Sequence, residues 1–101
     1  MSTETDKTLR LARDRIRNEL FDIIKDDRDF EEKHLILYVF LSAITDLAVK
    51  PKYTKDTACK RTAAQYLLTD DRHLEMMDLD AQWVRERLEK YGILNEARKH
   101  V

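Results

Sequence analysis

The sequence has few of the residues that interrupt helices or cross-link chains. Among its 101 residues there is one glycine (Gly92), one proline (Pro51) and one cysteine (Cys59). A single cysteine excludes an internal disulfide and is typical of the reducing cytoplasm, where we expect the protein to work. The scarcity of glycine and proline argues against the many turns of an all-β protein and favours helices.

The sequence also lacks the features of membrane proteins, of polyanion-binding proteins and of enzymes. No apolar run reaches the roughly 20 residues of a membrane-spanning helix, and the polar N-terminus resembles neither a signal peptide nor a lipid-anchor motif. The 19 basic and 20 acidic side chains give a formal charge of −1, which argues against polyanion binding by the whole chain. Phosphate loops, paired metal ligands and nucleophilic triads are also missing. We therefore expect no enzyme, no cofactor, no metal and no membrane contact.

The longest apolar segment runs from His34 to Val49 and organises the predicted fold. A helix that is apolar on nearly all sides must be covered by other helices. Two buried faces are expected, one formed by Leu37, Leu41, Ile44 and Ala48 and the other by Ile36, Phe40, Ala43 and Leu47. The polar stripe beside them consists of His34, Tyr38, Ser42 and Thr45, together with Asp46. Any apolar surface that remains uncovered would form a homodimer surface.

The segments on either side predict amphipathic helices that cover this central one. Before it, a helix over residues 6–25 would bury Leu9, Ala12, Ile16, Leu20, Ile23 and Ile24. The acidic run at residues 26–29 predicts a turn in which Asp29 caps the central helix and Glu32 completes a capping box. It offers carboxylates to a cation, but it lacks the glycine and the distal glutamate of a calcium loop.

Three more helices are expected after Pro51, which ends the central helix. Thr54 would cap a helix over residues 55–68, in which Cys59, Ala63, Tyr66 and Leu67 face inward and Lys60 and Arg61 face outward. Thr69 would cap a short helix over residues 70–77. Asp80 would cap a helix over residues 81–91 that ends at a left-handed Gly92.

The predicted fold is therefore all-α, with residues 1–101 in one domain. We expect a compact bundle of about five helices around a buried central helix, with a helix-turn-helix-like C-terminal corner. Residues 1–5 are expected to be frayed. Residues 93–101 either restart a short helix or fray.

Three arginines of the first predicted helix, Arg10, Arg13 and Arg17, fall within one narrow arc at 100° per residue. One interpretation is a stripe that binds a phosphate or an acidic partner. The other is a solvated face, because Asp6 and Asp14 lie in the same arc and can pair with arginines. We favour the solvated face.

The C-terminal corner has the outline of a helix-turn-helix motif, in which a short helix precedes a corner and a longer helix. In a DNA complex the second helix would enter the major groove, where Gln82 and Arg85 would contact base edges. The residues that would contact phosphates are Arg72, Arg87 and Lys90. Acidic residues crowd the same surface and would repel phosphates. A DNA-binding regulator is therefore the alternative function.

The C-terminal third also shows a likeness to a group of known proteins. The run Ala63-Ala64-Gln65-Tyr66-Leu67-Leu68-Thr69-Asp70-Asp71, followed by Leu74, Leu79-Asp80 and Val84-Arg85, resembles small phage and prophage proteins. Their pattern is an aromatic-Leu pair, a Ser/Thr-Asp-Asp cap, a core aromatic, Leu-Asp-Pro and Val-Arg. This chain has Ala81 in place of the proline, Tyr66 in place of a tryptophan and Leu74 in place of the aromatic. The group has no assigned function, so the resemblance implies a phage or bacterial accessory protein and no particular ligand.

We therefore expect a non-catalytic helical protein, a phage-type regulator or assembly factor that acts by protein–protein contact. Its partner would be another protein or a second copy of the chain.

Overall fold

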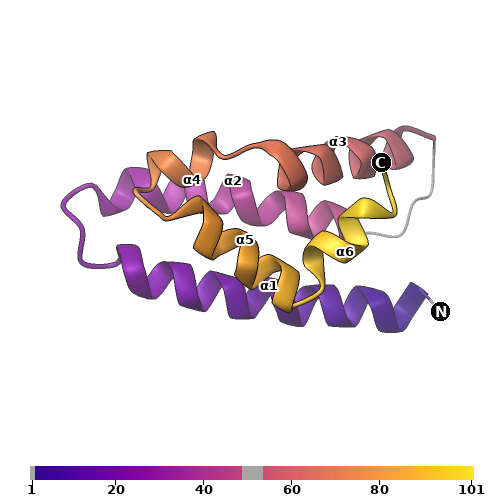
Figure 1. Ribbon diagram of the computed structural model, residues 1–101, viewed down its shortest axis with the longest axis horizontal. Coiled ribbons are helices and arrows are strands. Elements are labelled where there is room, and N and C mark those ends of the chain that lie inside the picture. Colours follow the sequence, from indigo (N-terminus) through magenta and orange to yellow (C-terminus); the bar gives the residue numbers. More distant parts are fainter. Residues whose placement is uncertain (1, 49–53) are drawn as a thin grey trace.

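The computed structural model describes the backbone of residues 2–48 and 54–101 and the side chains of residues 7–48 and 58–101. Six helices follow one another, and no strand is found among these residues (Figure 1). They are α1 (Ser2–Ile24), α2 (Phe30–Ala48), α3 (Thr54–Thr69), α4 (Arg72–Met76), α5 (Ala81–Lys90) and α6 (Ile93–Arg98). The predicted all-α bundle is confirmed.

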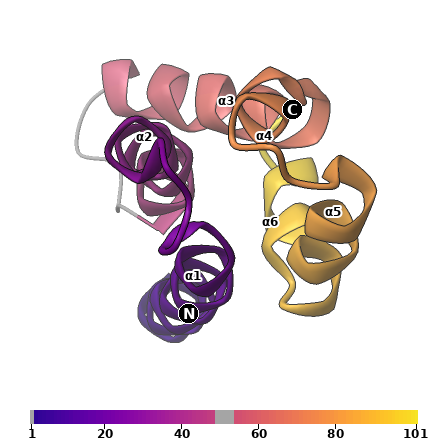
Figure 2. The same cartoon turned by 90° about the vertical axis from the view of Figure 1, so that its left-hand side faces the viewer.

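The helices form an elongated bundle with extents of 41 × 22 × 21 Å. Seen end on, α2 lies between α1 and α3, and α5 and α6 lie across the bundle from α1 and α2 (Figure 2). Helix α2 contacts α1, α3, α4 and α6. The central helix of the sequence is therefore also central in space, but one of its sides faces away from all of these neighbours.

The core consists of the apolar faces that the helical periodicity predicts. In α2, Leu37, Phe40 and Ile44 are almost fully buried, as are Leu41, Ala43, Leu47 and Ala48. In α1 the buried positions are Leu9, Ala12, Ile16, Leu20 and Ile24. The prediction was wrong for Ile23, which is exposed, because only the arc centred on Ile16 and Leu20 faces the rest of the bundle.

A buried lysine joins the α1–α2 turn to the α4–α5 corner. The Lys33 ammonium lies 2.7 Å from an oxygen of Asp27, 3.3 Å from Asp29 and 3.0 Å from Asp78. Its side chain is only 5% exposed, whereas all three carboxylates reach solvent. Hydrogen bonding, first to Asp27, raises the pKa of Lys33 well above the ordinary lysine range. The carboxylates of the acidic turn thus do bind a cation, and that cation is the ammonium group of Lys33 in the same chain.

Two predicted caps were wrong. Asp29 directly precedes α2 and its backbone carbonyl accepts from the N–H of Lys33, but its carboxylate pairs with the Lys33 ammonium and, among the described residues, accepts from no backbone N–H of α2. Thr69 is the last residue of α3, where its hydroxyl donates to the carbonyl of Gln65, so it does not cap α4. Asp71 occupies the N-cap position of α4, and the Asp70 carboxylate accepts from the N–H of Arg72.

The phase of α3 also differs from the prediction, because Lys60 is buried and Cys59 is exposed. The Lys60 ammonium donates to the carbonyl of Leu47 in the last turn of α2, at 2.9 Å. A positive charge at a helix C-terminus is favourable, and the aliphatic part of lysine can pack among apolar groups. This contact places Lys60 on the same buried face as Ala63, Ala64 and Leu67.

The C-terminal caps agree with the sequence. The Asp80 carboxylate accepts from the N–H groups of Gln82 and Trp83, and Gly92 is left-handed with φ = 79°. Residues 93–98 form α6, whose Ile93, Leu94 and Ala97 are buried, so this segment restarts a helix and does not fray. At the other end α1 begins at Ser2, ahead of the predicted start.

Three predictions lie outside the described residues. These are the break at Pro51, the capping side chain of Thr54 and the pairing of Asp6 with arginines.

Replacing Lys33 with methionine is expected to lower the melting temperature, because three carboxylates would then face one another without a cation. Lys7→Met, at an exposed position of α1, is the matched control and should melt like the parent. The folded state holds the Lys33 proton more tightly than the unfolded chain does. The stabilisation is therefore complete below about pH 10.5 and is lost as the pH rises through the raised pKa. Denaturation of parent and variant at pH 7 to 10 should show a constant difference; a difference that shrinks in that range would contradict the assignment.

Gly92→Val should lower the free energy of unfolding by about 1–2 kcal/mol, because a β-branched residue resists the left-handed region. A Cβ at this position would meet no atom within 4 Å, so the expected cost comes from backbone strain and not from a clash of the Cβ. Gly92→Asn should cost less, since asparagine tolerates this geometry. Urea denaturation measures both variants, and equal losses would show that the backbone conformation is not the cause.

Candidate functional site

Apolar side chains remain exposed along the outer side of α2. Leu35, Tyr38 and Val39 are 68%, 61% and 53% exposed, and Ser42 follows on the same stripe. We call these four residues the α2 ridge. The Ser42 hydroxyl donates to the carbonyl of Tyr38 at 2.8 Å, so its donor is satisfied within the helix. The ridge is thus a mainly apolar exposed strip, and such strips usually mark contact sites.

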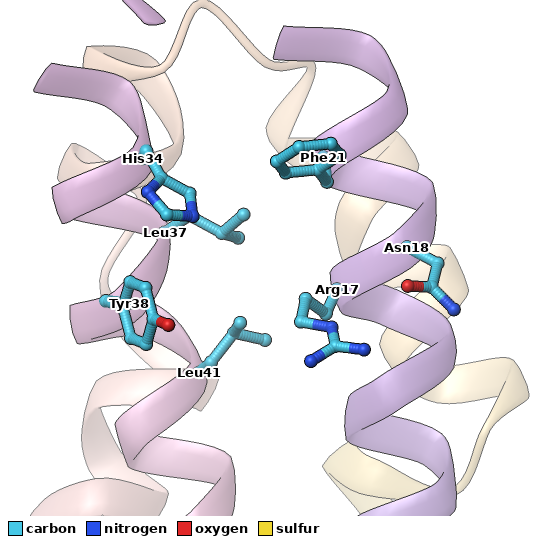
Figure 3. Close-up of a pocket in the computed structure, with 7 residues that line it drawn as sticks. All are labelled: Arg17, Asn18, Phe21, His34, Leu37, Tyr38 and Leu41. Atoms are coloured by element: carbon cyan, nitrogen blue, oxygen red, sulfur yellow. The ribbon is translucent and has the colours of Figure 1, made fainter. Parts of the chain in front are cut away.

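A groove runs along one side of the ridge, between α2 and α1. It consists of two adjoining hollows of about 280 Å³ each, which share Arg17, Tyr38 and Leu41. In Figure 3 the side chains of Arg17 and Phe21 on α1 lie opposite Leu41 and His34 on α2. We call this hollow the α1–α2 groove. It combines an apolar floor with a basic side chain.

Four rings cluster at the end of this groove near the α1–α2 turn, and three of them, those of Phe21, His34 and Tyr38, line it. The His34 ring stacks on Phe30 at 5.2 Å between centroids and meets the edge of Tyr38 at 5.0 Å. Phe21 meets Phe30 edge to face at 5.5 Å and His34 at 5.9 Å. Such offset and edge-to-face pairs are favourable beyond their burial. They account for His34 and Tyr38 as packing residues and fix the position of the Tyr38 ring within the ridge.

Two residues of the predicted arginine stripe, Arg13 and Arg17, lie along the α1 edge of the groove. Arg13 donates to the Thr45 hydroxyl of α2 at 2.9 Å and to the Asp14 carboxylate at 3.1 Å. Arg17 is exposed and lines both hollows, and Arg10 is exposed as well. Arg13 therefore joins α1 to α2, and Arg17 presents positive charge beside an apolar surface, whereas Arg10 is not among the residues that line the groove. The sequence alone did not relate this stripe to α2.

A second groove lies on the other side of the ridge, between α2 and α3. This α2–α3 groove has a volume of about 270 Å³ and includes Val39, Asp46, Cys59 and Tyr66 in its lining. Burial, together with the nearby Asp70 carboxylate, raises the pKa of Tyr66 to about 12. The tyrosine therefore stays neutral at physiological pH, and the groove is mainly apolar.

The five side chains predicted to contact DNA do not lie together on one surface. Arg85 donates to the carbonyl of Leu68 at 2.7 Å and to the Asp71 carboxylate, so it joins α5 to the α3–α4 junction. The Arg87 guanidinium lies over the Trp83 ring at 5.1 Å. Gln82 faces Glu86 on its own helix at 3.5 Å, and Arg72 and Lys90 are exposed. The corner thus does not gather these five side chains into one free basic surface.

The sequence pattern did not predict the ridge, because Leu35 and Val39 belong to neither of the two faces of α2 that it assigned to the core. The four-residue spacing of Leu35 and Val39, next to Tyr38, could have indicated a further apolar stripe on α2. The aromatic cluster also gave a partial signal, since His34 and Tyr38 are four residues apart, whereas Phe21 reaches them only through the packing of α1 on α2.

Comparisons with protein-family models, with curated proteins and with solved structures found no match to this chain. In the described part of the chain no helix is long and apolar enough to cross a bilayer. Within those same residues, no group of three or more His, Cys, Asp or Glu side chains is placed to hold a metal ion.

Arg85→Ala should lower the free energy of unfolding by about 1–3 kcal/mol, because it removes charged hydrogen bonds that hold the α3–α4 junction. Arg72→Ala, at an exposed position of α4, should change it by less than about 0.5 kcal/mol. Chemical denaturation compares the two. Equal, small effects would show that the Arg85 contacts contribute nothing to the fold and would return this side chain to the candidates for DNA contact.

Proposed function

We propose that the protein is a non-catalytic interaction module that binds a helix of a protein partner over the α2 ridge and the two grooves beside it. The observation that carries the proposal is the exposure of Leu35, Tyr38 and Val39 on the most apolar helix of the chain. A small phage-type regulator or assembly factor is the biological role that we propose for it.

The shape of this surface favours a helical partner. A ridge flanked by two grooves matches the way in which helices pack, with the ridge of one helix entering the groove of another. Apolar helices docked into such grooves are a common form of protein recognition. The grooves are open and shallow, and a protein side chain fits them better than an enclosed small molecule does.

The charges beside the surface favour a partner with acidic residues. Arg17 is exposed and lines both hollows of the α1–α2 groove, and arginine is well suited to pair with carboxylates at an interface. An apolar helix with a carboxylate on the side that faces α1 would therefore pack on the ridge and also pair with the arginine.

DNA binding is supported less well. Arg85 already has partners within the chain, and Asp78, Asp80, Glu86 and Glu89 carry negative charge around the same corner. Since phosphate neutralisation supplies most non-specific affinity, this surface would bind a duplex weakly.

Photo-cross-linking in the source cells tests the proposal. A photoreactive phenylalanine derivative placed at Tyr38 should form adducts with protein, and the same group placed at Leu11 should not. Leu11 is the matched control because it is also exposed on a helix, at 65%, but lies on the side of α1 that faces Tyr91. Leu35→Glu should abolish the adducts at position 38. Equal adducts at both positions, or none at position 38, would refute a contact function for this face.

A further inference from the structure

The two hollows of the α1–α2 groove are offset from each other by one helical turn. We call the one nearer the α1–α2 turn the first hollow and the other the second. On α2 the lining of the first runs from His34 to Leu41, and that of the second from Tyr38 to Thr45. This shift of four residues is about 6 Å along the helix axis. Side chains three or four positions apart on a partner helix have a similar separation, so one helix along the groove can place a side chain in each hollow.

Different chemical groups line the two hollows. The rings of Phe21 and His34 line the first. Arg13 and the hydroxyl groups of Ser42 and Thr45 line the second. The first hollow therefore favours a large apolar or aromatic side chain, and the second favours a side chain that accepts hydrogen bonds from arginine and hydroxyl groups.

Arg17 is the cation available to such an acceptor. It is exposed, it lines both hollows, and in Figure 3 its guanidinium group points from α1 toward Leu41. Arg13 already bonds to Thr45 and to the Asp14 carboxylate, so its charge is partly balanced within the chain. Among the residues that the structure describes, no acidic side chain lines either hollow. A carboxylate in the second hollow would thus meet a cation and no like charge.

The groove on the other side of the ridge disfavours the same carboxylate. Asp46 is exposed and lines the α2–α3 groove, but it lines neither hollow of the α1–α2 groove. An acidic side chain held on the α3 side would therefore meet a like charge, which is unfavourable at an interface. The acidic side chain of a partner helix is thus directed to the α1 side of the ridge.

We propose that the partner helix of this face carries a large apolar side chain and a carboxylate three or four positions apart. The apolar side chain enters the first hollow, and the carboxylate pairs with Arg17 in the second. The inference rests on the proposed contact function and specifies the chemistry of its partner. The spacing follows from the one-turn offset of the hollows, and it holds for either direction of the partner helix.

Reversing the charge of Arg17 tests the ion pair. With the photoreactive phenylalanine derivative at position 38, Arg17→Glu should lose most of the adducts, because the partner's carboxylate would then meet a like charge. Arg10→Glu is the matched control and should keep them, since Arg10 is exposed on the same helix but lines neither hollow. Adducts that persist in Arg17→Glu would overturn the inference. An equal loss in Arg10→Glu would also overturn it, because the charge effect would then not belong to the groove.

A synthetic peptide of the cross-linked segment tests the spacing. Mass spectrometry of the adduct identifies the segment, and fluorescence anisotropy with the purified full chain measures its Kd. Replacing the peptide's carboxylate with lysine should weaken binding to the parent by about tenfold and restore binding to Arg17→Glu, which also shows that this variant is folded. Moving the carboxylate by two positions turns it to the far side of the helix and should weaken binding as much as removing it. A segment without a carboxylate at the proposed spacing, or a Kd that is insensitive to the charge exchange, would refute the pattern.

The two proposals fail in different ways. Adducts at position 38 that are the same in the parent and in Arg17→Glu would refute the paired apolar and acidic side chains and leave the contact function in place. A parent that gives no adducts at position 38 would refute both.

Discussion

The structure depends on covering a helix that is apolar on almost every side. No single neighbour can cover such a helix, and here α1, α3, α4 and α6 each contact a part of α2. Ile44 and Leu37 are buried as a result, whereas Leu35, Tyr38 and Val39 are left outside. The side that the chain leaves uncovered is the face on which the proposed function rests. The fold and the proposed contact function thus both depend on one hydrophobic segment.

Basic side chains hold this helix in position at both ends. Lys33 ties the first turns of α2 to the acidic turn and to Asp78, and Lys60 satisfies the carbonyl of Leu47 in its last turn. Arg85 has a similar role at the α3–α4 junction. Several cations that the sequence would place in solvent therefore stabilise the fold. Arg17 remains exposed beside the apolar strip and is the basic side chain available to the proposed partner.

The candidate site could be predicted only in part. The arc of Arg10, Arg13 and Arg17 follows from spacing alone, because a helix fixes the angle between residues three and seven apart. That this arc borders a groove depends on how α1 packs against α2, which the Arg13–Thr45 contact shows. The prediction of Cys59 as a core residue was wrong for the same kind of reason. Which side of α3 is buried depends on the Leu47 carbonyl of α2, which accepts from the Lys60 ammonium. The sequence pattern of α3 alone contains no information about that contact.

Local physics explains what the sequence by itself determined: the helical class, the apolar faces of α1 and α2, the Asp80 cap and the left-handed Gly92. Each follows from residues within one or two turns of one another. The tertiary structure alone decided which cations are buried, since an ammonium group at the end of a long apolar stem can lie in solvent or reach a distant carboxylate. It also decided that the uncovered strip of α2 lies between two grooves, because a groove exists only once two helices have packed side by side.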